Sequence, residues 1–459
     1  YPGEMLELYL PVVRECLYND GDLREVLVSL YLIQGLCSKR SPNFSVMGQF
    51  FDRVCFVIRN SIGYLDGNEL MSRLAFHSIW AANRIVRVCD KISSDRRTFD
   101  FVLELLDLDI RNVGLTFSVK SLSIALFKSS QPSVIDEYFN RFFDRLFYGI
   151  DDLGDDELDI HIASLRQLYQ SVPCRSRNII DSYPNLRRSL EFYIKKFSDS
   201  SNSGEMKILR ILELINTCIE KSSKTDFKTY LEDLVDTMTT IPGHYSDLTL
   251  ESIINIFASL CRVFKGEFAA QSQKVIEAIK FGFRSQSPSI IESSMILCGD
   301  FMTFVSQEHV ELIVDMFDTY DSLDGYLRQN RIMPVFIKSF AVMYYKIDIG
   351  SEGFFEWDES YIERFYNIVV PILNSANLSK SSKYNRNFDP YFNARVFESC
   401  FWAMAAFFKN CRVTHLNLNR AKREVVPRII DCFHTKAYDA STLLAVSEFL
   451  VCVVDKFRS

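Results

Sequence analysis

The chain has 459 residues, 48% of them hydrophobic, and a formal net charge of −7. Its 17 Gly and 12 Pro are few for that length, which argues against a β-rich fold. The acidic balance argues against general nucleic-acid binding, because duplex affinity depends on clustered Lys and Arg. No apolar run reaches the roughly 18 residues that span a bilayer, so no membrane segment is expected.

Helical periodicity, with apolar residues at i, i+3, i+4 and i+7, starts near the first residue and continues to the end of the chain. We expect ten helix pairs, each with a first helix (A) and a second helix (B). In chain order they are Gly3–Tyr18 with Asp22–Cys37, Ser45–Asn60 with Asn68–Lys91, Phe99–Leu108 with Arg111–Lys128, Pro132–Gly149 with Asp155–Ser171, Leu186–Phe197 with Glu205–Lys221, Phe227–Thr240 with Leu248–Phe264, Phe268–Phe283 with Ile290–Val305, His309–Leu323 with Arg328–Lys346, Glu359–Leu373 with Tyr391–Lys409, and Ala421–Phe433 with Tyr438–Phe457. The period is about 45 residues, that of HEAT repeats. The sequence therefore predicts an all-α fold, a right-handed α–α superhelix (solenoid) of about ten HEAT repeats.

No change of composition marks a domain boundary, so residues 1–459 are expected to form a single HEAT-repeat solenoid. Polar segments at 151–157, 198–204 and 377–389 are expected to be surface loops. The chain begins Tyr1-Pro2-Gly3, with neither an initiator Met nor a signal-peptide pattern, and we interpret it as a partial chain.

The sequence lacks the common motifs of catalysis. It contains no Gly-x-x-x-x-Gly-Lys loop and no His-Glu-x-x-His, and its six histidines are dispersed. The 12 cysteines form no Cys-x-x-Cys pair, and most fall on apolar helix faces. They are expected to be reduced core residues of a cytosolic or nuclear protein. We expect no enzyme activity, no metal and no cofactor.

Several short elements resemble repeats of the importin-β family of nuclear-import karyopherins, and they occur in the family's order. Tyr9–Leu17 with Asn19–Glu25 is similar to an A helix with an internal Pro, its turn and the start of its B helix. Ser78–Ile85 is similar to the Trp-bearing B helix of the next repeat. Further similar elements are Leu297–Asp300, Ser339–Phe355 and Pro390–Cys400. In residues 130–240 only the helix pattern is similar, and the whole resembles the C-terminal half of such a receptor, without its first repeats.

In that family the B helices line a concave face that holds the basic segment of the adaptor importin-α, or basic cargo signals directly. Acidic side chains pair there with Arg and Lys, and Trp indoles stack on the cationic stems. The resemblance therefore implies a partner-binding face that is acidic and carries an indole. Its candidate residues are Trp80, Asn83, Phe117, Glu25, Glu69, Asp159, Glu205, Glu251, Glu292 and Glu398. Phe117 stands where the family's following repeat carries a Trp. A Phe at this position retains apolar stacking but weakens the cation–π attraction.

Structural roles stay open for all these residues: core packing for Trp80, and solvation or a helix-dipole role for each carboxylate. The family also binds Phe-Gly nucleoporins between A helices, for which Phe-rich A helices offer candidates, namely Phe227, Phe268, Phe281, Phe283 and Phe317. The family binds RanGTP mainly through N-terminal repeats, so we expect this chain to contain at best part of that site. The resemblance implies a location in the cytoplasm, the nucleus and the pores of the nuclear envelope.

Two other functions stay open on the sequence. One is a HEAT-repeat scaffold or adaptor subunit unrelated to nuclear transport, which would show no special affinity for basic signals or Phe-Gly peptides. The other is the regulatory solenoid of a large enzyme, with its catalytic sequence elsewhere in a longer chain.

Overall fold

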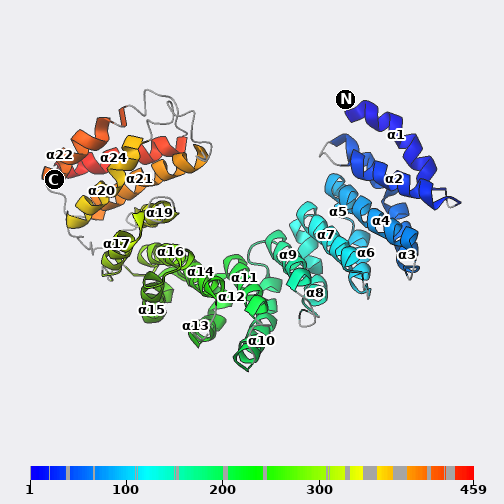
Figure 1. Cartoon of the computed structure of the whole chain (residues 1–459), viewed down its shortest axis with the longest axis horizontal. Helices are drawn as coiled ribbons and strands as arrows, with labels where there is room; N and C mark the ends of the chain where they lie inside the picture. The colour runs from blue at the N-terminus through cyan, green and yellow to red at the C-terminus, as the bar shows by residue number, and fades with distance from the viewer. Residues whose placement is uncertain are drawn as a thin grey trace. The chain divides into compact units, whose positions relative to one another are not determined.

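Every secondary-structure element that the computed structural model describes is a helix (Figure 1). The described residues are 2–19, 21–37, 42–65, 68–108, 110, 112–148, 150, 155–199, 205–240, 246–306, 309, 311–325, 331–344, 359–375, 390–410, 415–427, 429–430 and 440–458. Helices alternate between A and B positions along the chain, and within each unit consecutive B helices pack on each other. The predicted all-α HEAT-repeat solenoid is confirmed.

The chain forms two compact units, Tyr1–Glu232 and Asp233–Ser459. The A helices of the first unit are α1 (Pro2–Leu17), α3 (Phe51–Ile62), α6 (Arg96–Leu106), α8 (Pro132–Phe147) and α10 (Arg177–Asp199). Its B helices are α2 (Leu23–Leu36), α4 (Glu69–Val88), α7 (Val113–Ser129), α9 (Asp155–Ser171) and α11 (Glu205–Lys221). Each B helix packs along the next one, so the five form a continuous layer.

The second unit repeats this arrangement. Its A helices are α13 (Leu231–Thr240), α15 (Ser272–Phe283), α17 (Glu311–Ser322), α20 (Glu359–Ser375) and α22 (His415–Arg420). Its B helices are α14 (Asp247–Phe264), α16 (Pro288–Phe304), α19 (Met333–Tyr344), α21 (Pro390–Asn410) and α24 (Ala440–Arg458), and each packs on the next. Shorter elements are α5 (Asp90–Ser93), α12 (Lys224–Phe227), the 3-10 turns Pro42–Phe50, Lys228–Tyr230 and Lys265–Gln271, and the π turn Ala421–Val425.

Side-chain caps explain where three B helices begin. The carboxylate of Asp22 accepts a hydrogen bond from the Arg24 N–H at 2.8 Å, ahead of α2. Asn68 and Asn112 accept one from N–H groups in the first turns of α4 and α7, at 3.2 and 3.1 Å. Such caps satisfy N–H groups that have no partner within the helix. The short polar turns of the sequence thus stop one helix and start the next.

Some helix bounds differ from the prediction. The A helix expected at Leu186 begins at Arg177, because Ile179 and Tyr183 are fully buried and extend its apolar stripe across Pro184. The B helix expected to reach Lys91 is interrupted at Cys89, whose backbone is extended. Two A helices begin with 3-10 turns. The polar segments 151–154, 200–204 and 376–389 lie outside the described residues.

The cysteines behave largely as expected. Among the ten that the structure describes, all as free thiols, eight are buried and Cys174 is exposed. Burial raises the pKa of the Cys37 and Cys218 thiols to about 12, so these thiols stay protonated and unreactive. Cys411 and Cys432 lie outside the described residues.

Ion pairs join helices of neighbouring repeats within each unit. They connect an Arg of one A helix to a carboxylate of the adjacent A helix at 2.7–2.9 Å. Examples are Arg59–Glu104, Arg96–Glu137, Arg141–Asp100 and Arg364–Asp318. Exposed pairs of this kind each contribute only about 0–1 kcal/mol to stability. Their effect is to favour one register between successive repeats.

Gly299 allows α16 and α19 to approach closely. A Cβ at this position would lie 2.9 Å from the Ser339 carbonyl oxygen and 3.0 Å from its Cα. We therefore expect Gly299→Ala to destabilise the protein by about 1–3 kcal/mol, although alanine is the better helix former. Thermal unfolding followed by circular dichroism tests this.

Gly35→Ala is the matched control, because nothing lies within 4 Å of a Cβ built at Gly35 of α2. It should gain about 0.5–1 kcal/mol from helix propensity alone. A Gly299→Ala protein that unfolds at or above the wild-type midpoint would contradict the close approach.

Candidate functional site

Hydrogen bonds fix the register of α4 against α7. The Asn83 Nδ2 donates to the Ser121 carbonyl at 2.9 Å. At the last residue of α5, the Ser93 Oγ donates to the Ser129 carbonyl at 3.0 Å, and the Ser130 Oγ donates to the Ser93 carbonyl at 2.5 Å. All three bonds join residues 36 to 38 positions apart, so the two helices run in the same direction. This offset places Trp80 of α4 level with Phe117 of α7.

Aromatic side chains follow this register across three consecutive B helices. We call Tyr31 of α2, Phe76, His77 and Trp80 of α4, and Phe117 of α7 the aromatic surface. The Tyr31 hydroxyl lies 2.9 Å from His77 Nε2, and the Phe76 and Trp80 ring centroids are 6.1 Å apart. Tyr31 is 50% exposed and Phe117 is 47% exposed. Large apolar side chains on adjacent helices are thus open to solvent.

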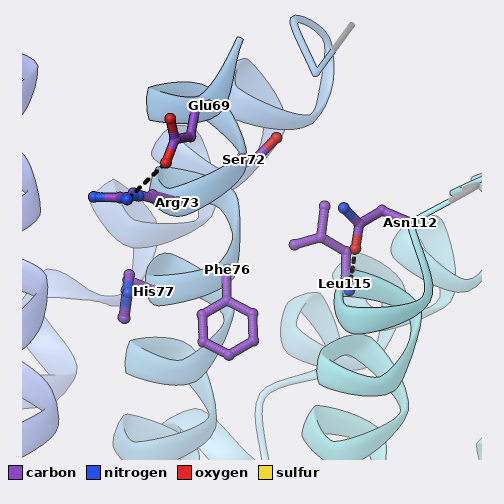
Figure 2. Close-up of a pocket in the computed structure, with 7 residues that line it drawn as sticks. All are labelled: Glu69, Ser72, Arg73, Phe76, His77, Asn112 and Leu115. Carbon is purple, nitrogen blue, oxygen red and sulfur yellow. Dashed lines mark hydrogen bonds and ion pairs between the residues drawn. The ribbon is translucent and has the colours of Figure 1, made fainter. Parts of the chain in front are cut away.

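A pocket of about 300 Å³ opens between α4 and α7 beside this surface (Figure 2). It is lined by Glu69, Ser72, Arg73, Phe76, His77, Asn112 and Leu115. Phe76 points toward Leu115, whereas His77 points to the other side of α4 (Figure 2). Burial, and then the Arg73 charge, lower the pKa of His77, which keeps this imidazole neutral near pH 7.

The structure gives the three residues predicted around the indole different environments. Trp80 is partly buried, and its Nε1 has no hydrogen-bond partner among the described residues. Asn83 is 1% exposed and bonded to Ser121, so its side chain ties α4 to α7 and does not face a partner. Phe117 is on the surface. Whether Trp80 and Phe117 contact a partner stays a prediction.

Sequence reasoning missed Phe76 and Tyr31 as surface residues. The available signal was the spacing of Phe76, Trp80 and Arg84 at i, i+4 and i+8, which puts all three on one face of α4. That face is separate from the fully buried one that carries Ile79 and Val86. Because the aromatic residues lie next to the buried aliphatic face of α4, the two faces look like one broad apolar stripe in the sequence.

The charge around the aromatic surface is mixed, because α4 is basic and α9, which packs on α7, is acidic. Helices α4 and α7 carry Arg73, Arg84, Arg87, Lys120 and Lys128 against one carboxylate, Glu69. Glu69 is itself paired with Arg73 at 2.6 Å. The neighbouring helix α2 carries one Arg and one Glu, and α5 carries one Asp and one Lys. Helix α9, on the other side of α7, carries four carboxylates and one Arg, so the charges of these helices nearly balance.

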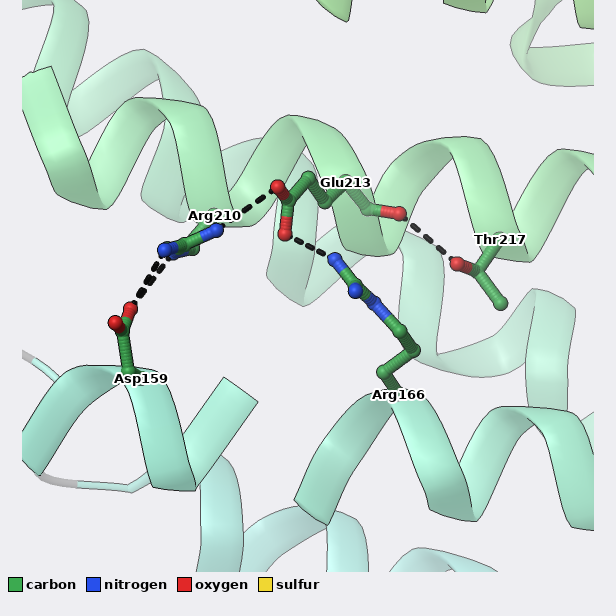
Figure 3. Close-up of polar contacts among 5 residues, drawn as sticks. All are labelled: Asp159, Arg166, Arg210, Glu213 and Thr217. Atoms are coloured by element: carbon green, nitrogen blue, oxygen red, sulfur yellow. Dashed lines mark hydrogen bonds and ion pairs between the residues drawn. The ribbon is translucent and has the colours of Figure 1, made fainter. Parts of the chain in front are cut away.

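Other carboxylates that were predicted to meet a basic partner are neutralised within the chain. Asp159 of α9 pairs with Arg210 of α11 at 2.7 Å, and Arg210 also pairs with Glu213 at 2.9 Å (Figure 3). Arg166 of α9 approaches Glu213 from the other side (Figure 3). This group has equal numbers of acidic and basic side chains, so its main effect is to bind α9 to α11.

The remaining candidates are spread along the B helices. Glu25 accepts a hydrogen bond from Asn19 at 2.7 Å. Glu205 is partly buried at the start of α11, and Glu398 of α21 lies 3.4 Å from the indole nitrogen of Trp402. Each has contacts within the chain, and none joins the aromatic surface.

Glu251 and Glu292 differ, because two carboxylates share one cation. Glu292 of α16 is paired with Arg331, at the start of the segment that leads into α19. Burial raises the pKa of Glu251 of α14, and the Glu292 charge raises it further. A hydrogen bond from Ser289 and the Arg331 charge act in the opposite direction. This cluster, which we call the α14–α16 acidic cluster, retains an excess of negative charge.

Most of the Phe side chains considered for a groove between A helices belong to the core. Phe227, Phe268 and Phe317 are 0% exposed, and Phe283 is 9% exposed. Phe281 of α15 is 51% exposed and is the one member of that set on the surface. These residues mainly hold the A and B layers together.

Within the described ranges, no helix is long and apolar enough to cross a membrane. The same part of the chain contains no group of three or more His, Cys, Asp or Glu side chains placed to hold a metal ion.

No family model matches the sequence, and no curated protein matches it. Solved structures are similar in fold. A crystal structure of importin-β matches with a TM-score of 0.72 and 12% identity over 98% of this chain and 55% of that chain. The Kap95:Nup1 complex matches with a TM-score of 0.66 and 9% identity over 99% of this chain and 58% of that chain. Kap121p bound to Pho4p matches with a TM-score of 0.60 and 12% identity over 99% of this chain and 46% of that chain. The chain therefore spans about half the length of each, and its HEAT-repeat solenoid has the fold of the karyopherins.

Proposed function

We propose that the chain is part of a nuclear transport receptor of the importin-β kind, binding protein partners along its layers of B helices. The support is a fold shared with importin-β, Kap95 and Kap121p over nearly the whole chain, with karyopherin-like sequence elements in order. Two of those structures contain bound proteins, Nup1 and Pho4p. In this proposal the chain has no catalytic role, acts in the cytoplasm, the nucleus and the nuclear pore, and binds Phe-Gly nucleoporins. RanGTP would bind mainly to further repeats.

The α14–α16 acidic cluster is the observation from which we propose a basic ligand. Glu251 and Glu292 share Arg331, and the raised pKa of Glu251 reflects burial next to a like charge. A Lys or Arg side chain of a ligand would supply the missing positive charge and form charge-assisted hydrogen bonds. We therefore place a basic import signal, or the basic segment of importin-α, over α14 and α16.

Titration of the chain with a synthetic Arg/Lys-rich peptide, by calorimetry at two salt concentrations, tests this site. Wild-type protein should bind the peptide, more weakly at high salt because the exposed charges are screened. The double variant Glu251→Gln/Glu292→Gln should bind about tenfold more weakly, since it removes both negative charges of the cluster and leaves Arg331 without a carboxylate partner there. Glu69→Gln removes one carboxylate that Arg73 already balances, so it serves as the control.

An equal loss of affinity in Glu69→Gln would show that only net charge matters and would reject the location. No binding at low salt would reject basic-signal recognition by this chain and favour a HEAT scaffold unrelated to transport.

A further inference from the structure

We infer that α14, α16 and α19 form a polarised peptide site, whose ligand carries a basic side chain and, about four residues away, an acidic one. The inference rests on the proposed function, because the basic side chain is the one that would bind the α14–α16 acidic cluster. It deepens that function by naming a second subsite of opposite charge, and with it the charge pattern of the partner.

Three charged side chains farther along the same helices form the mirror image of the acidic cluster. The Arg262 guanidinium of α14 donates to the Asp300 carboxylate of α16 at 2.6 Å. Lys338 of α19 is exposed and has no ion pair within the part of the chain that the structure describes. Burial raises the pKa of Asp300, and the charges of Arg262 and Lys338 oppose this increase. Two cations thus share one carboxylate in this group, which we call the cationic cluster.

The two clusters lie on one face of the helices. Arg262 follows Glu251 by 11 residues, and Lys338 follows Arg331 by 7. These intervals are about three and about two whole helical turns, so the later side chain points the same way as the earlier one. A ligand that binds to this face therefore meets both clusters.

The distance between the clusters sets the spacing of charges on the ligand. Asp300 lies eight residues beyond Glu292 along α16, which corresponds to about 12 Å. An extended peptide rises about 3.3 Å per residue, so a segment that follows α16 covers this distance in about four residues. Ile296 and Val335, both partly exposed, lie between the clusters. They favour an apolar side chain between the two charged ones.

Charges around the two clusters have the same polarity. Contact between the Phe340 and Phe407 rings, whose centroids are 4.8 Å apart, sets the level of α21 against α19. Among the described side chains of these B helices and their flanking turns, the further charges are Asp247, Glu398 and Arg284 at the acidic end, and Lys265, Lys409 and Glu267 at the cationic end. Counted with the clusters, the acidic end has four carboxylates against two cations, and the cationic end has the reverse. A peptide of complementary polarity is therefore held in one direction.

The test is fluorescence anisotropy on the full chain with a labelled peptide that has the core Arg-Arg-Ser-Leu-Ser-Glu. Alternate side chains of an extended segment share a face, so the second Arg, the Leu and the Glu point the same way. The comparison peptides carry Gln or Lys in place of Glu. We expect the Glu peptide to bind at least about fivefold more tightly than the Gln peptide, although its net positive charge is lower.

Lys338→Gln should remove this preference and leave the affinity for the Gln peptide unchanged, as in a double-mutant cycle. Lys280→Gln, on the A helix α15, makes the same change of net charge and should retain the preference. The inference is overturned if the Gln or Lys peptide binds wild-type protein as tightly as the Glu peptide, or if Lys338→Gln retains the preference.

The proposed function and this inference can be told apart. If all three peptides bind equally and the Glu251→Gln/Glu292→Gln variant weakens each of them, the basic subsite stands and only the polarised site fails. If none of the peptides binds at low salt, both fail.

Discussion

Replacement of Lys120 by Met is expected to raise the free energy of unfolding by about 2 kcal/mol at pH 7. Lys120 of α7 is 3% exposed, and its Nζ contacts Nδ1 of His161 of α9, which is 8% exposed. Burial lowers the Lys120 pKa to about 8, and the Glu157 charge only partly opposes this. A shift of that size corresponds to about 3 kcal/mol, from which about 1 kcal/mol is subtracted for the hydrogen bond that His161 loses.

The pH dependence follows from the same shift. The Lys120 pKa is about 8 in the folded state and near 10.5 in the unfolded state. Below pH 8 both states are protonated and the cost of the buried charge is fully present. Between pH 8 and about 10.5 the folded protein releases this proton first, so the cost disappears as pH rises. The advantage of Lys120→Met should therefore shrink from pH 7 to pH 10. His161, whose pKa burial and Lys120 lower to about 4, stays neutral throughout.

Chemical denaturation of both proteins at pH 7 and pH 10 measures this effect. Lys128→Met, on the exposed side of the same helix, is the control and should change stability by less than about 0.5 kcal/mol. A destabilised Lys120→Met protein would show that the Lys120–His161 contact is worth more than its desolvation costs.

The second large effect is expected at Arg262, where replacement by Met should lower stability by about 3 kcal/mol at pH 8. The Arg262 Nη1 donates to the Asp300 Oδ2 at 2.6 Å, joining α14 to α16. Asp300 is 5% exposed, and removal of Arg262 leaves its charge buried with Lys338 as the nearest opposite influence. Burial raises the Asp300 pKa to about 6, against the opposing effect of the Arg262 charge and hydrogen bond.

The pKa of Asp300 is about 6 in the folded state, above its ordinary value of 3.8. Between pH 3.8 and about 6, Asp300 is therefore protonated in the folded protein and ionised in the unfolded protein. Its ionisation therefore costs stability as pH rises toward 6, and the cost is complete above that. Without Arg262 the pKa rises further, so the loss in Arg262→Met should be larger at pH 8 than at pH 5.

Denaturation at the two pH values tests this, with Arg59→Met as the matched control. That variant breaks the exposed Arg59–Glu104 pair, in which both side chains are about half exposed, and should cost under about 1 kcal/mol. The explanation requires that Arg262→Met leaves the Asp300 carboxylate buried without a partner. It would be contradicted if the two variants lost equal stability, or if the loss in Arg262→Met did not depend on pH.

The helical-repeat fold could be predicted from the sequence. Apolar residues at helical spacing, sparse Gly and Pro, and polar capping residues such as Asp22 and Asn68 are local properties, and each is legible within one helix. The predicted start of α10 at Leu186 was wrong, because the buried residues Ile179 and Tyr183 extend the helix back to Arg177, across Pro184. The resemblance to karyopherins depended on short sequence elements in the family's order. The comparison with solved structures supports this resemblance for the fold.

Which candidate side chains are available to a partner depends on contacts between repeats, and these could not be predicted from the sequence. Asp159, Glu69 and Glu251 all lie early in B helices, and nothing in the sequence distinguishes them. In the structure, Arg210 balances Asp159 and Arg73 balances Glu69. Glu251, in contrast, shares Arg331 with Glu292. The pairing partner often lies in the next repeat, 38 to 51 residues away, as in Arg262–Asp300 and Arg210–Asp159. The register that brings such residues together is set by packing of whole helices, for example by the buried Asn83 bond to Ser121. Helix periodicity specifies which face a side chain occupies but carries no information on what stands opposite it, so charge balance at a site emerges only when the layers are assembled.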